Sequence, residues 1–300
     1  MMDGKIALIE AGGTKFIVGV GDASRQIQAR TRIDTTRPEE TIPAAIDWLR
    51  QQGGDYAAVG IASFGPLDLD RASPQWGHIT RTTKPHWSMA DVAGPFARAF
   101  TCPVAINTDV NGAALAEWMW GAGQATNSSL YLTVGTGVGG GAVVGGQLVH
   151  GVTHPEMGHI RMPRHPADTG FEGTCPFHGD CLEGLAAGPS IIARWGASLS
   201  DLPSDHIGHR IIAWYLAHAI ATFQAILEPA RIILGGGVME SPGLLARIRS
   251  EAVEAAAGYF AGRPQEMIVP PALGDSAGLL GALALTLVEG HPHSAGAKRQ

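Results

Sequence analysis

Short apolar runs alternate with longer segments of helical length along this chain. The runs of strand length lie at 5–10, 16–22, 56–63, 103–107, 129–135, 231–237 and 266–270. The segments predicted to be helices lie at about 38–52, 183–199, 206–228, 241–260 and 277–289, with another that begins near Asp109. Strands that alternate with helices are typical of α/β proteins, so the pattern predicts this fold class.

The opening pattern of a strand, a glycine turn and a second strand occurs twice, near 5–22 and near 130–144. This repetition predicts two similar α/β domains on either side of a cleft. The expected boundaries are 1–111 for the N-terminal domain, joined by the C-terminal helix 276–289, and 112–275 for the C-terminal domain, with a His- and Cys-bearing loop at 153–182.

Composition and charge exclude several classes of function. Hydrophobic residues make up 45% of the chain and charged residues 16%, which is typical of a well-packed enzyme and not of a disordered protein. A net charge of −6 without a dense block of Lys or Arg argues against a nucleic-acid partner. The sequence carries neither an apolar run of about 18 residues nor a charged N-terminal segment before an apolar one. We therefore expect no membrane partner and a cytoplasmic location.

Two glycine-rich turns are candidates for binding an anion, because glycine lets backbone N–H groups approach a ligand closely. The first, AGGTK at 11–15, joins two predicted strands, and its alternative interpretation is an ordinary hairpin. The second, TVGTGVGGG at 133–141, has the Rossmann spacing at Gly135, Gly137 and Gly140. That fingerprint requires a helix straight after the glycines, whereas a hairpin pattern follows here, which argues against dinucleotide binding.

A third glycine cluster and one aspartate have both a structural and a functional interpretation. The cluster at 234–237 (LGGG) suits flat contact with a planar group such as adenine, or a tight turn from a strand into a helix. Asp109 stands between a predicted strand and a predicted helix, where aspartate is usually an N-cap. It is also placed as a carboxylate that accepts a proton in phosphoryl transfer would be.

Two His and two Cys residues form the pattern H-x15-C-x2-H-x2-C. They are His159, Cys175, His178 and Cys181. Four such ligands with short inner spacing predict a closed tetrahedral Zn²⁺ site with a structural role, which would fix the surrounding loop. The alternative is two inert thiols beside unrelated histidines. Cys102 lies outside this cluster, and we expect it to pack in the core.

Taken together and in this order, these motifs resemble the ROK family of sugar kinases. They are GGTK near the N-terminus, Asp-x-Asn at a helix start, GTGVGGG, Glu-x-Gly-His, the Cys/His cluster and LGGG. The resemblance is to the zinc-containing bacterial fructokinase branch in particular. It implies an actin-like (ribonuclease-H-like) ATPase fold and phosphorylation of a hexose hydroxyl by MgATP, with fructose converted to fructose 6-phosphate. It also implies a tendency towards homodimers.

The resemblance assigns a role to individual residues. It implies that Asp109 is the general base. The residues implied to contact the sugar are Gly65, Pro66, Asn111, Glu156, His159 and Glu183. The residues implied to bind ATP and Mg²⁺ are Glu10, Gly12, Gly13, Thr14, Lys15, Thr133, Gly135, Thr136, Gly137, Pro189, Gly235, Gly236, Gly237 and Met239. The four metal ligands of the branch match His159, Cys175, His178 and Cys181.

Two departures from the family pattern bear on the substrate. Glu10 fills a position that is more commonly aspartate, a variant that resembles the fructokinase branch. In the segment 77–91, Thr83 and His86 replace the proline and glycine of the fructokinase pattern, while Lys84 and Trp87 match it. Trp87 is alternatively a packed or partner-facing aromatic.

The alternatives within and beyond this family remain open from the sequence. A glucokinase, a mannokinase or an N-acetylhexosamine kinase would carry the same motifs. A catalytically dead sugar sensor should have lost Asp109 or a phosphate loop, and both are present. The family's transcriptional repressors carry an N-terminal helix-turn-helix, whereas here the first predicted strand begins at about residue 5.

Overall fold

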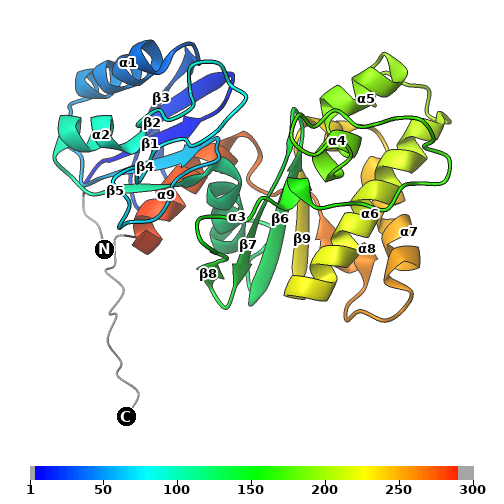
Figure 1. The fold of residues 1–300 in the computed structure, drawn as a ribbon. Coiled ribbons are helices and arrows are strands. Elements are labelled where there is room, and N and C mark those ends of the chain that lie inside the picture. Colours follow the sequence, from blue (N-terminus) through cyan, green and yellow to red (C-terminus); the bar gives the residue numbers. More distant parts are fainter. Residues whose placement is uncertain (1–3, 290–300) are drawn as a thin grey trace. The chain divides into compact units, whose positions relative to one another are not determined.

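The computed structural model describes residues 4–289, which divide into two compact units (Figure 1). Unit 1 contains the described residues 4–116, 151–154 and 275–289, and unit 2 contains 117–150 and 155–274. Helix α3 (Asp109–Trp120) therefore begins in unit 1 and ends in unit 2.

Unit 1 is built on a five-stranded mixed sheet in the order β3-β2-β1-β4-β5. Its strands are β1 (Ile6–Ala11), β2 (Lys15–Gly21), β3 (Ile27–Asp34), β4 (Ala58–Ser63) and β5 (Val104–Thr108). Strands β1, β4 and β5 are parallel, and β2 runs antiparallel to β1 and β3. The register aligns Ala11 with Ser63 and Ser63 with Thr108, so the three parallel strands end together at one edge of the sheet.

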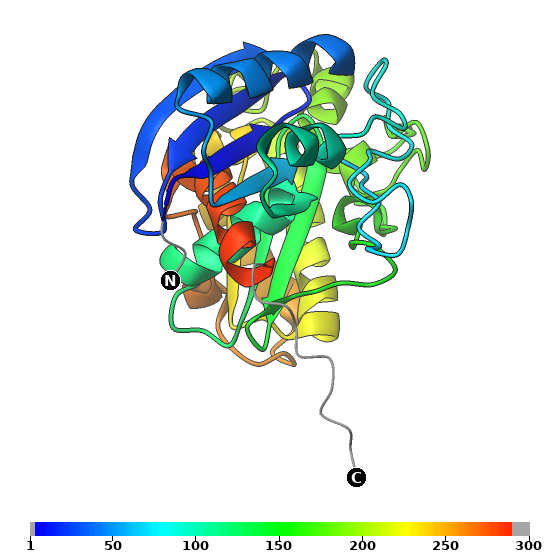
Figure 2. The ribbon, with the colours of Figure 1, turned by 90° about the vertical axis from the view of Figure 1, so that its left-hand side faces the viewer.

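Helices cover the sheet of unit 1. Helix α1 (Pro38–Gln51) packs on β2 and β3, and α2 (Ala93–Phe100) packs on β4 and β5 (Figures 1 and 2). Helix α9 (Ala277–Glu289) packs on β1, β4 and β5. Helix α1 starts with a proline and two glutamates and ends with an arginine, an arrangement that suits the helix dipole. Its buried apolar residues follow the i, i+3, i+4, i+7 spacing of one helix face: Ile42, Ala45, Ile46 and Leu49.

Trp87 belongs to the core of unit 1. Its side chain is fully buried, its ring lies 5.3 Å from that of Phe64 and 5.6 Å from that of Phe16, and its indole N–H donates to the carbonyl of Thr36 at 2.8 Å. A buried tryptophan with its N–H satisfied is a packing residue. Of the two interpretations of Trp87, the packed one therefore holds.

Unit 2 contains a second five-stranded mixed sheet, in the order β10-β9-β6-β7-β8. Its strands are β6 (Ser128–Val134), β7 (Val138–Val144), β8 (Gln147–Leu148), β9 (Arg231–Gly235) and β10 (Ile268–Val269). The register pairs Thr133 of β6 with Gly235 of β9 in parallel, so both strands end at the same edge. The β7–β8 turn is made by Gly145 and Gly146, both at positive φ, as the Gly-Gly pattern predicts.

The helices of unit 2 enclose a large apolar core. They are α4 (Leu182–Ala186), α5 (Gly188–Trp195), α6 (Ile207–Leu227), α7 (Leu244–Ala256) and α8 (Pro264–Met267), with 3₁₀ turns η1 (Met157–His159) and η2 (Gly237–Glu240). A third such turn, η3 (Gly274–Ser276), begins at the last residue of unit 2 and ends in unit 1. Helix α6 is apolar and, at 21 residues, long enough to cross a membrane. Most of its side chains are buried in the core, where it packs on α4 and α7, and a buried core helix meets the same length criterion.

Two secondary-structure predictions were wrong. Strand β3 was not predicted, because it is an exposed edge strand whose alternating pattern IQARTRID contains few apolar residues. The single helix predicted over 183–199 is two short helices separated at Ala187, which is extended at φ −68° and ψ 159°. Pro189 follows at the start of α5, where its missing N–H is tolerated, whereas the interior of a continuous helix would lose a hydrogen bond there.

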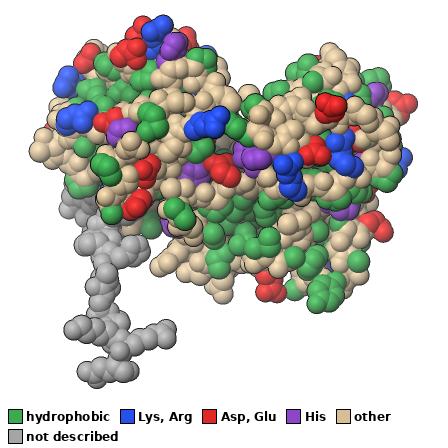
Figure 3. Space-filling model, in the orientation of Figure 1, with side chains coloured by type: hydrophobic (Ala, Val, Ile, Leu, Met, Phe, Trp, Pro, Cys, Tyr) green, Lys and Arg blue, Asp and Glu red, His purple; other side chains and the backbone are tan. Residues whose placement is uncertain are grey.

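Surface charges of both signs are interspersed on the face drawn in Figure 3. In unit 2, Arg161 lies 2.9 Å from Asp180, and Arg164 lies 3.7 Å from the same carboxylate. In unit 1, Arg98 lies 3.3 Å from Asp91. Exposed pairs of this kind contribute little to stability, so the surface is locally balanced without being held together by its charges.

A buried carboxylate near the end of α3 accepts three backbone N–H groups from two segments of unit 2. Glu117 is fully buried, and its Oε2 accepts the N–H of Ala122 at 2.7 Å. Its Oε1 accepts the N–H groups of Ala272 and Leu273, each at 3.0 Å. The carboxylate thus satisfies backbone donors from segments that lie far apart in the sequence, which offsets the cost of burying its charge.

Replacing Glu117 with glutamine should lower the free energy of unfolding by about 2–4 kcal/mol, because one amide NH₂ would face backbone donors that then lose their acceptor. Urea titration followed by circular dichroism measures this loss. Glu254→Gln on the exposed face of α7 is the matched control and should change stability by less than about 0.5 kcal/mol. Equal stability of the two variants would contradict the anchoring role of Glu117.

Candidate functional site

In unit 1, the first glycine turn is fixed at its base and open at its tip. Gly12 N–H donates to the carbonyl of Lys15 at 3.0 Å, which closes the turn between β1 and β2. Thr35, just after β3, donates its hydroxyl to the carbonyl of Gly12 at 2.7 Å. A Cβ added to Gly13 would meet nothing within 4 Å. A rigid turn with an open tip suits an anion, because its N–H groups need little rearrangement to receive one.

Asp109 lies at the same edge of the sheet, directly after β5. Its Oδ1 accepts the N–H of the next residue, Val110, at 2.8 Å. The capping bond of the helix comes from Thr108, whose hydroxyl oxygen accepts the N–H of Asn111 at 3.2 Å. Because Thr108 makes the cap three residues ahead, as an N-cap does, the interpretation of Asp109 as the N-cap does not hold.

Two carboxyl groups of unit 1 have unusually high pKa values. Burial raises the pKa of Asp109 to about 6, against the N–H of Val110, and the negative charge of Glu10 adds to the increase. Burial also raises the pKa of Glu10, while the charge of Lys15 lowers it. Gly278 of α9 lies directly against the Glu10 carboxylate, where any side chain would clash. Carboxyl groups with raised pKa values beside one another are typical of catalytic sites.

Asn111 is buried two residues into α3 with half of its amide unused. Its Nδ2 donates to Oδ1 of Asn107 at 2.8 Å. Its Oδ1 is buried and has no hydrogen-bond partner among residues 4–289. A buried acceptor without a donor is costly, so Asn111 is prepared to receive a hydroxyl or a water.

Gly65 and Pro66 follow β4 at this edge and are joined by a cis peptide bond. His154, which belongs to the same unit, accepts the N–H of Leu67 through Nε2 at 3.0 Å. Its Cε1 would lie 3.8 Å from a Cβ placed on Gly65. The structure of unit 1 thus gathers the turn 12–14, Glu10, Gly65, Asp109 and Asn111 around the ends of three parallel strands.

In unit 2, the second glycine turn joins β6 to β7 and lies beside the third glycine cluster. Gly135 N–H donates to the carbonyl of Gly137 at 2.9 Å. A Cβ on Gly135 would lie 3.8 Å from the backbone nitrogen of Gly237. Gly236, at φ 92°, leads from β9 into η2, where Met239 N–H donates to its carbonyl at 2.9 Å. Thr133, Gly135 and the cluster 235–237 therefore lie together, as the two strand ends require.

Two His and two Cys side chains of unit 2 converge on one point. The four ligand atoms of His159, Cys175, His178 and Cys181 all lie within 4.8 Å of one another. Nδ1 of His159 lies 3.3 Å from Nδ1 of His178, 3.7 Å from Sγ of Cys175 and 3.5 Å from Sγ of Cys181. A tetrahedral zinc with bonds of about 2.0–2.1 Å to nitrogen and about 2.3 Å to sulfur would separate the ligands by about 3.3–3.8 Å. The cluster is therefore consistent with a structural zinc site.

His159 and Glu156 are oriented towards each other. With Nδ1 in the Cys/His cluster, Nε2 of His159 lies 4.0 Å from a carboxylate oxygen of Glu156. A histidine that ligates a metal through one nitrogen commonly directs the other to a carboxylate, which fixes its ring orientation. Glu156 is thus tied to the cluster, although it is not one of its four members.

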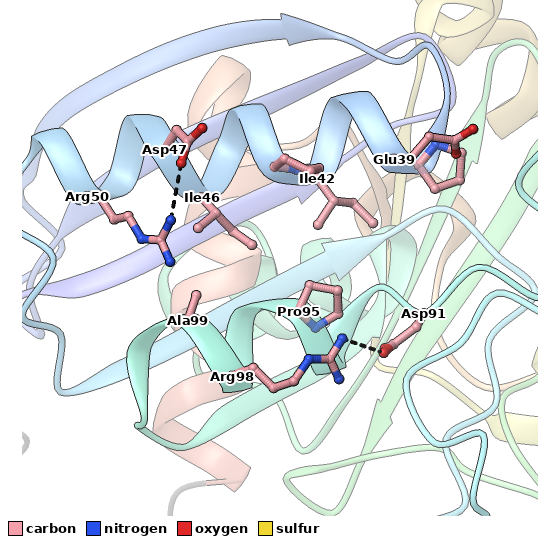
Figure 4. Close-up of a pocket in the computed structure, with 11 residues that line it drawn as sticks. Glu39, Ile42, Ile46, Asp47, Arg50, Asp91, Pro95, Arg98 and Ala99 are labelled. Carbon is pink, nitrogen blue, oxygen red and sulfur yellow. Dashed lines mark hydrogen bonds and ion pairs between the residues drawn. The ribbon is translucent and has the colours of Figure 1, made fainter.

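A further pocket of unit 1 lies apart from these residues. It is lined by α1 and the segment 91–99, including Ile42, Ile46, Pro95 and Arg98 (Figure 4). Asp47 pairs with Arg50 at 3.3 Å and Asp91 with Arg98 at 3.3 Å along its two sides. Asp91, the last residue of the segment 77–91, lines it, but none of the predicted catalytic, substrate-binding, cofactor-binding or metal-binding residues does, so it is not the candidate site.

The model of the ROK family matches residues 6–289 of the chain, nearly all of what the structure describes. The chain belongs to the ROK family. The resemblance inferred from the sequence is thereby confirmed. Each motif alone is short, so it was their order along the chain that identified the family.

Relatives of this ROK protein include kinases of several sugars. It is 51% identical over 286 residues to a fructokinase from Zymomonas mobilis, covering 93% of this chain and 95% of that protein. It resembles the crystal structure of a ROK hexokinase from Thermus thermophilus with a TM-score of 0.77 and 29% identity, covering 95% and 99% of the two chains. It resembles a ROK glucokinase from Streptomyces griseus, solved with glucose and AMPPNP, with a TM-score of 0.73 and 26% identity, covering 93% and 98%.

These likenesses confirm the predicted fold class: two mixed five-stranded α/β sheets of the ROK, actin-like type. Three residues beside the predicted ones were not found from the sequence. The sequence gives no signal for Thr108 or Gly278. The capping hydrogen bond of Thr108 and the space that Gly278 leaves for Glu10 are visible only in the folded structure. His154 stands in the string HPEMGH, next to predicted residues, which was a signal of position alone.

Proposed function

We propose that this chain is an ATP-dependent fructokinase that converts fructose to fructose 6-phosphate, with Asp109 as the general base. The observation that carries the proposal is the carboxylate of Asp109, freed from capping by Thr108 and with a pKa raised to about 6. A general base works best when its pKa lies near the working pH. The substrate part is supported by the 51% identity to a fructokinase, against 29% or less to the hexokinase and glucokinase structures.

In the proposed reaction, Asp109 accepts the proton of the sugar hydroxyl. The hydroxyl oxygen then forms a bond to the γ-phosphorus of ATP as the bond from that phosphorus to the bridging oxygen breaks, and ADP leaves. Asn111 offers its buried Oδ1 to a sugar hydroxyl, and Gly65, Pro66, Glu156, His159 and Glu183 complete the sugar-binding set. The glycine turns at 12–15 and 133–137 receive the phosphates. Pro189, Gly235–Gly237 and Met239 contact the adenosine.

The proposal includes Mg²⁺, which Glu10 would help to bind. Its carboxylate ends β1 beside the first glycine turn and would hold a water of the hydrated ion, which supplies charge neutralisation to the phosphates when bound. The four ligands His159, Cys175, His178 and Cys181 would hold Zn²⁺ as a closed set, which supplies rigidity to the loop 153–182 and no open coordination position. A cytoplasmic location and a homodimer complete the proposal, and sedimentation analysis tests the dimer.

The experiment that tests the substrate is a coupled assay for ADP release over fructose, glucose, mannose and N-acetylated hexosamines. The proposal expects kcat/KM to be highest for fructose. Preference for another hexose would replace fructose and leave the kinase assignment in place. No turnover with any hexose, combined with sugar binding, would favour the sugar-sensor alternative.

The activity should depend on pH through the carboxyl of Asp109. The base accepts a proton only when it is ionised, so kcat/KM should rise with pH through about 6 and level off above it. At pH 5 the value should be roughly a tenth of the plateau, because about nine in ten Asp109 carboxyls are then protonated. A profile of kcat/KM for fructose from pH 4.5 to 8.5 measures this. A profile that stays flat down to pH 4.5 would contradict it.

A further inference from the structure

One short segment of unit 2 holds both ends of the second glycine turn. The N–H of Val138, the first residue of β7, donates to Oε2 of Glu183 at 3.0 Å. At the other end of the turn, the carbonyl of Gly135 accepts the N–H of Gly188 at 2.8 Å. Glu183 lies on α4 and Gly188 begins α5, so the six residues from 183 to 188 span the turn.

The carboxylate of Glu183 lies so close to Gly137 that a side chain at this position would displace it. A Cβ added to Gly137 would lie 2.6 Å from Oε2 of Glu183, which is inside van der Waals contact. The carboxylate therefore rests against the turn itself and is not merely directed at it. A hydrogen bond from a backbone N–H to a carboxylate is stronger than one to a neutral acceptor.

The peptide of Val138 is also confined on its carbonyl side. A Cβ added to Gly158 would overlap the carbonyl oxygen of Val138, so the turn between Glu156 and His159 packs directly against this strand. The first residue of β7 is thus held at its N–H by Glu183 and at its carbonyl by the backbone of η1. Little freedom remains for the turn 135–137 to change its conformation.

We infer that Glu183 is a positioning residue for the phosphates of ATP, in that its carboxylate holds the second glycine turn in the shape that receives them. The inference rests on the proposed function and deepens it, because a sugar contact alone gives Glu183 no reason to accept the N–H of Val138. Oε2 of Glu183 accepts the N–H of Val138, which follows the turn. Glu183 thereby connects the proposed sugar-binding residues with the turn that is proposed to receive the phosphates.

The same connection extends to the Cys/His cluster by way of the chain itself. Glu183 follows Cys181 by two residues, and Cys181 is the N-cap of the helix that carries Glu183. The N–H of Leu182 donates to the carbonyl of Ile160 at 3.0 Å, which joins this helix to the segment after His159. Order in the cluster is therefore transmitted to the turn through α4.

The test compares Glu183→Ala, Glu183→Gln and Ser190→Ala in the full chain. Ser190 donates its hydroxyl to the backbone carbonyl of Glu183 at 2.9 Å, so its loss perturbs the same segment without touching the carboxylate. Calorimetry measures the Kd of a non-hydrolysable ATP analogue with Mg²⁺ in the absence of sugar. Steady-state kinetics measures KM for ATP and for fructose separately.

In Glu183→Ala, the Kd of the ATP analogue without sugar should rise by roughly ten- to a hundredfold. Glu183→Gln should recover most of this loss, because its amide oxygen can still accept the N–H of Val138. Ser190→Ala should stay within about threefold of the unmodified chain. A second variant, Gly137→Ala, should weaken the analogue as well, since its methyl group displaces the carboxylate without removing it.

The outcomes separate the inference from the proposed function. An unchanged analogue Kd in Glu183→Ala, with a raised KM for fructose alone, would overturn the inference and leave the kinase in place. No binding of the analogue by the unmodified chain would overturn the proposed function itself. Equal losses in Glu183→Ala and Ser190→Ala would show that only the packing of α4 matters, which also overturns the inference.

Discussion

Replacing Asp109 with asparagine should lower kcat for fructose phosphorylation by about 10²–10⁴-fold while leaving the protein folded. The amide has the size of the carboxyl but cannot accept the hydroxyl proton, and general base catalysis contributes on this scale. The helix should persist because its N-cap is Thr108 and not Asp109. The expected result is thus a loss of turnover with little change in stability. Steady-state kinetics and thermal unfolding measure the two quantities on the same preparations.

The matched control for this substitution is Asp47→Asn. Asp47 is exposed on α1, where it pairs with Arg50 at 3.3 Å, so the same change of charge should leave kcat within about twofold. The affinity for ATP and for fructose should remain measurable in Asp109→Asn by calorimetry. Full activity in Asp109→Asn would remove Asp109 as the base.

Loss of the predicted zinc should disable the enzyme by releasing the loop 153–182. Cys175→Ser removes one of the four converging ligands, and we expect the bound zinc to fall well below one per chain. The loop carries Glu156 and leads into the helix with Glu183, so kcat/KM for fructose should fall by at least tenfold. Elemental analysis gives the zinc content, limited proteolysis reports the opened loop, and the coupled assay gives the activity.

Cys102→Ser is the control that the chain itself provides. Cys102 is the third cysteine, half-buried at the margin of the core of unit 1 and outside the cluster. Its replacement should keep one zinc per chain and an intact loop. If removal of zinc from the unmodified chain left sugar affinity and turnover unchanged, the structural role of the metal in the sugar site would be wrong.

The sequence predicts more of the topology than of the detailed contacts, for physical reasons. Apolar runs report burial, so β1, β4, β5, β6 and β9, which are almost wholly buried, were predicted to within two or three residues. Strand β3 alternates exposed residues at a sheet edge and was missed. The division of 183–199 was missed because a helical pattern does not show that Ala187 is extended, and this break is what places Glu183 and Gly188 at opposite ends of the glycine turn.

The same reason explains why some of the predicted site residues, and not others, could be interpreted from the sequence. Short sequence spacing suffices to identify the Cys/His cluster, because three of its members lie within seven residues. It cannot distinguish a base from a cap, since both functions are carried by a short polar side chain before a helix. One hydrogen bond, from the N–H of Asn111 to the hydroxyl oxygen of Thr108, argues against the cap, and the base remains a proposal. Gly278 leaves space for the carboxylate of Glu10. These two residues lie far apart in the sequence, so only the folded structure reveals the contact.

Helix α3 constrains which changes of chain length this protein can accept. Asp109 and Glu117 lie at the two ends of one continuous helix, eight residues apart, so the helical repeat fixes the angle between their side chains. One inserted residue would turn one end by about 100° relative to the other and move it by about 1.5 Å. The proposed base Asp109 and the anchoring carboxylate of Glu117 could then not both keep their partners. Loops such as 68–78 and 197–206 do not hold two side chains at a fixed angle to each other. We therefore expect natural insertions and deletions in these loops and not in α3.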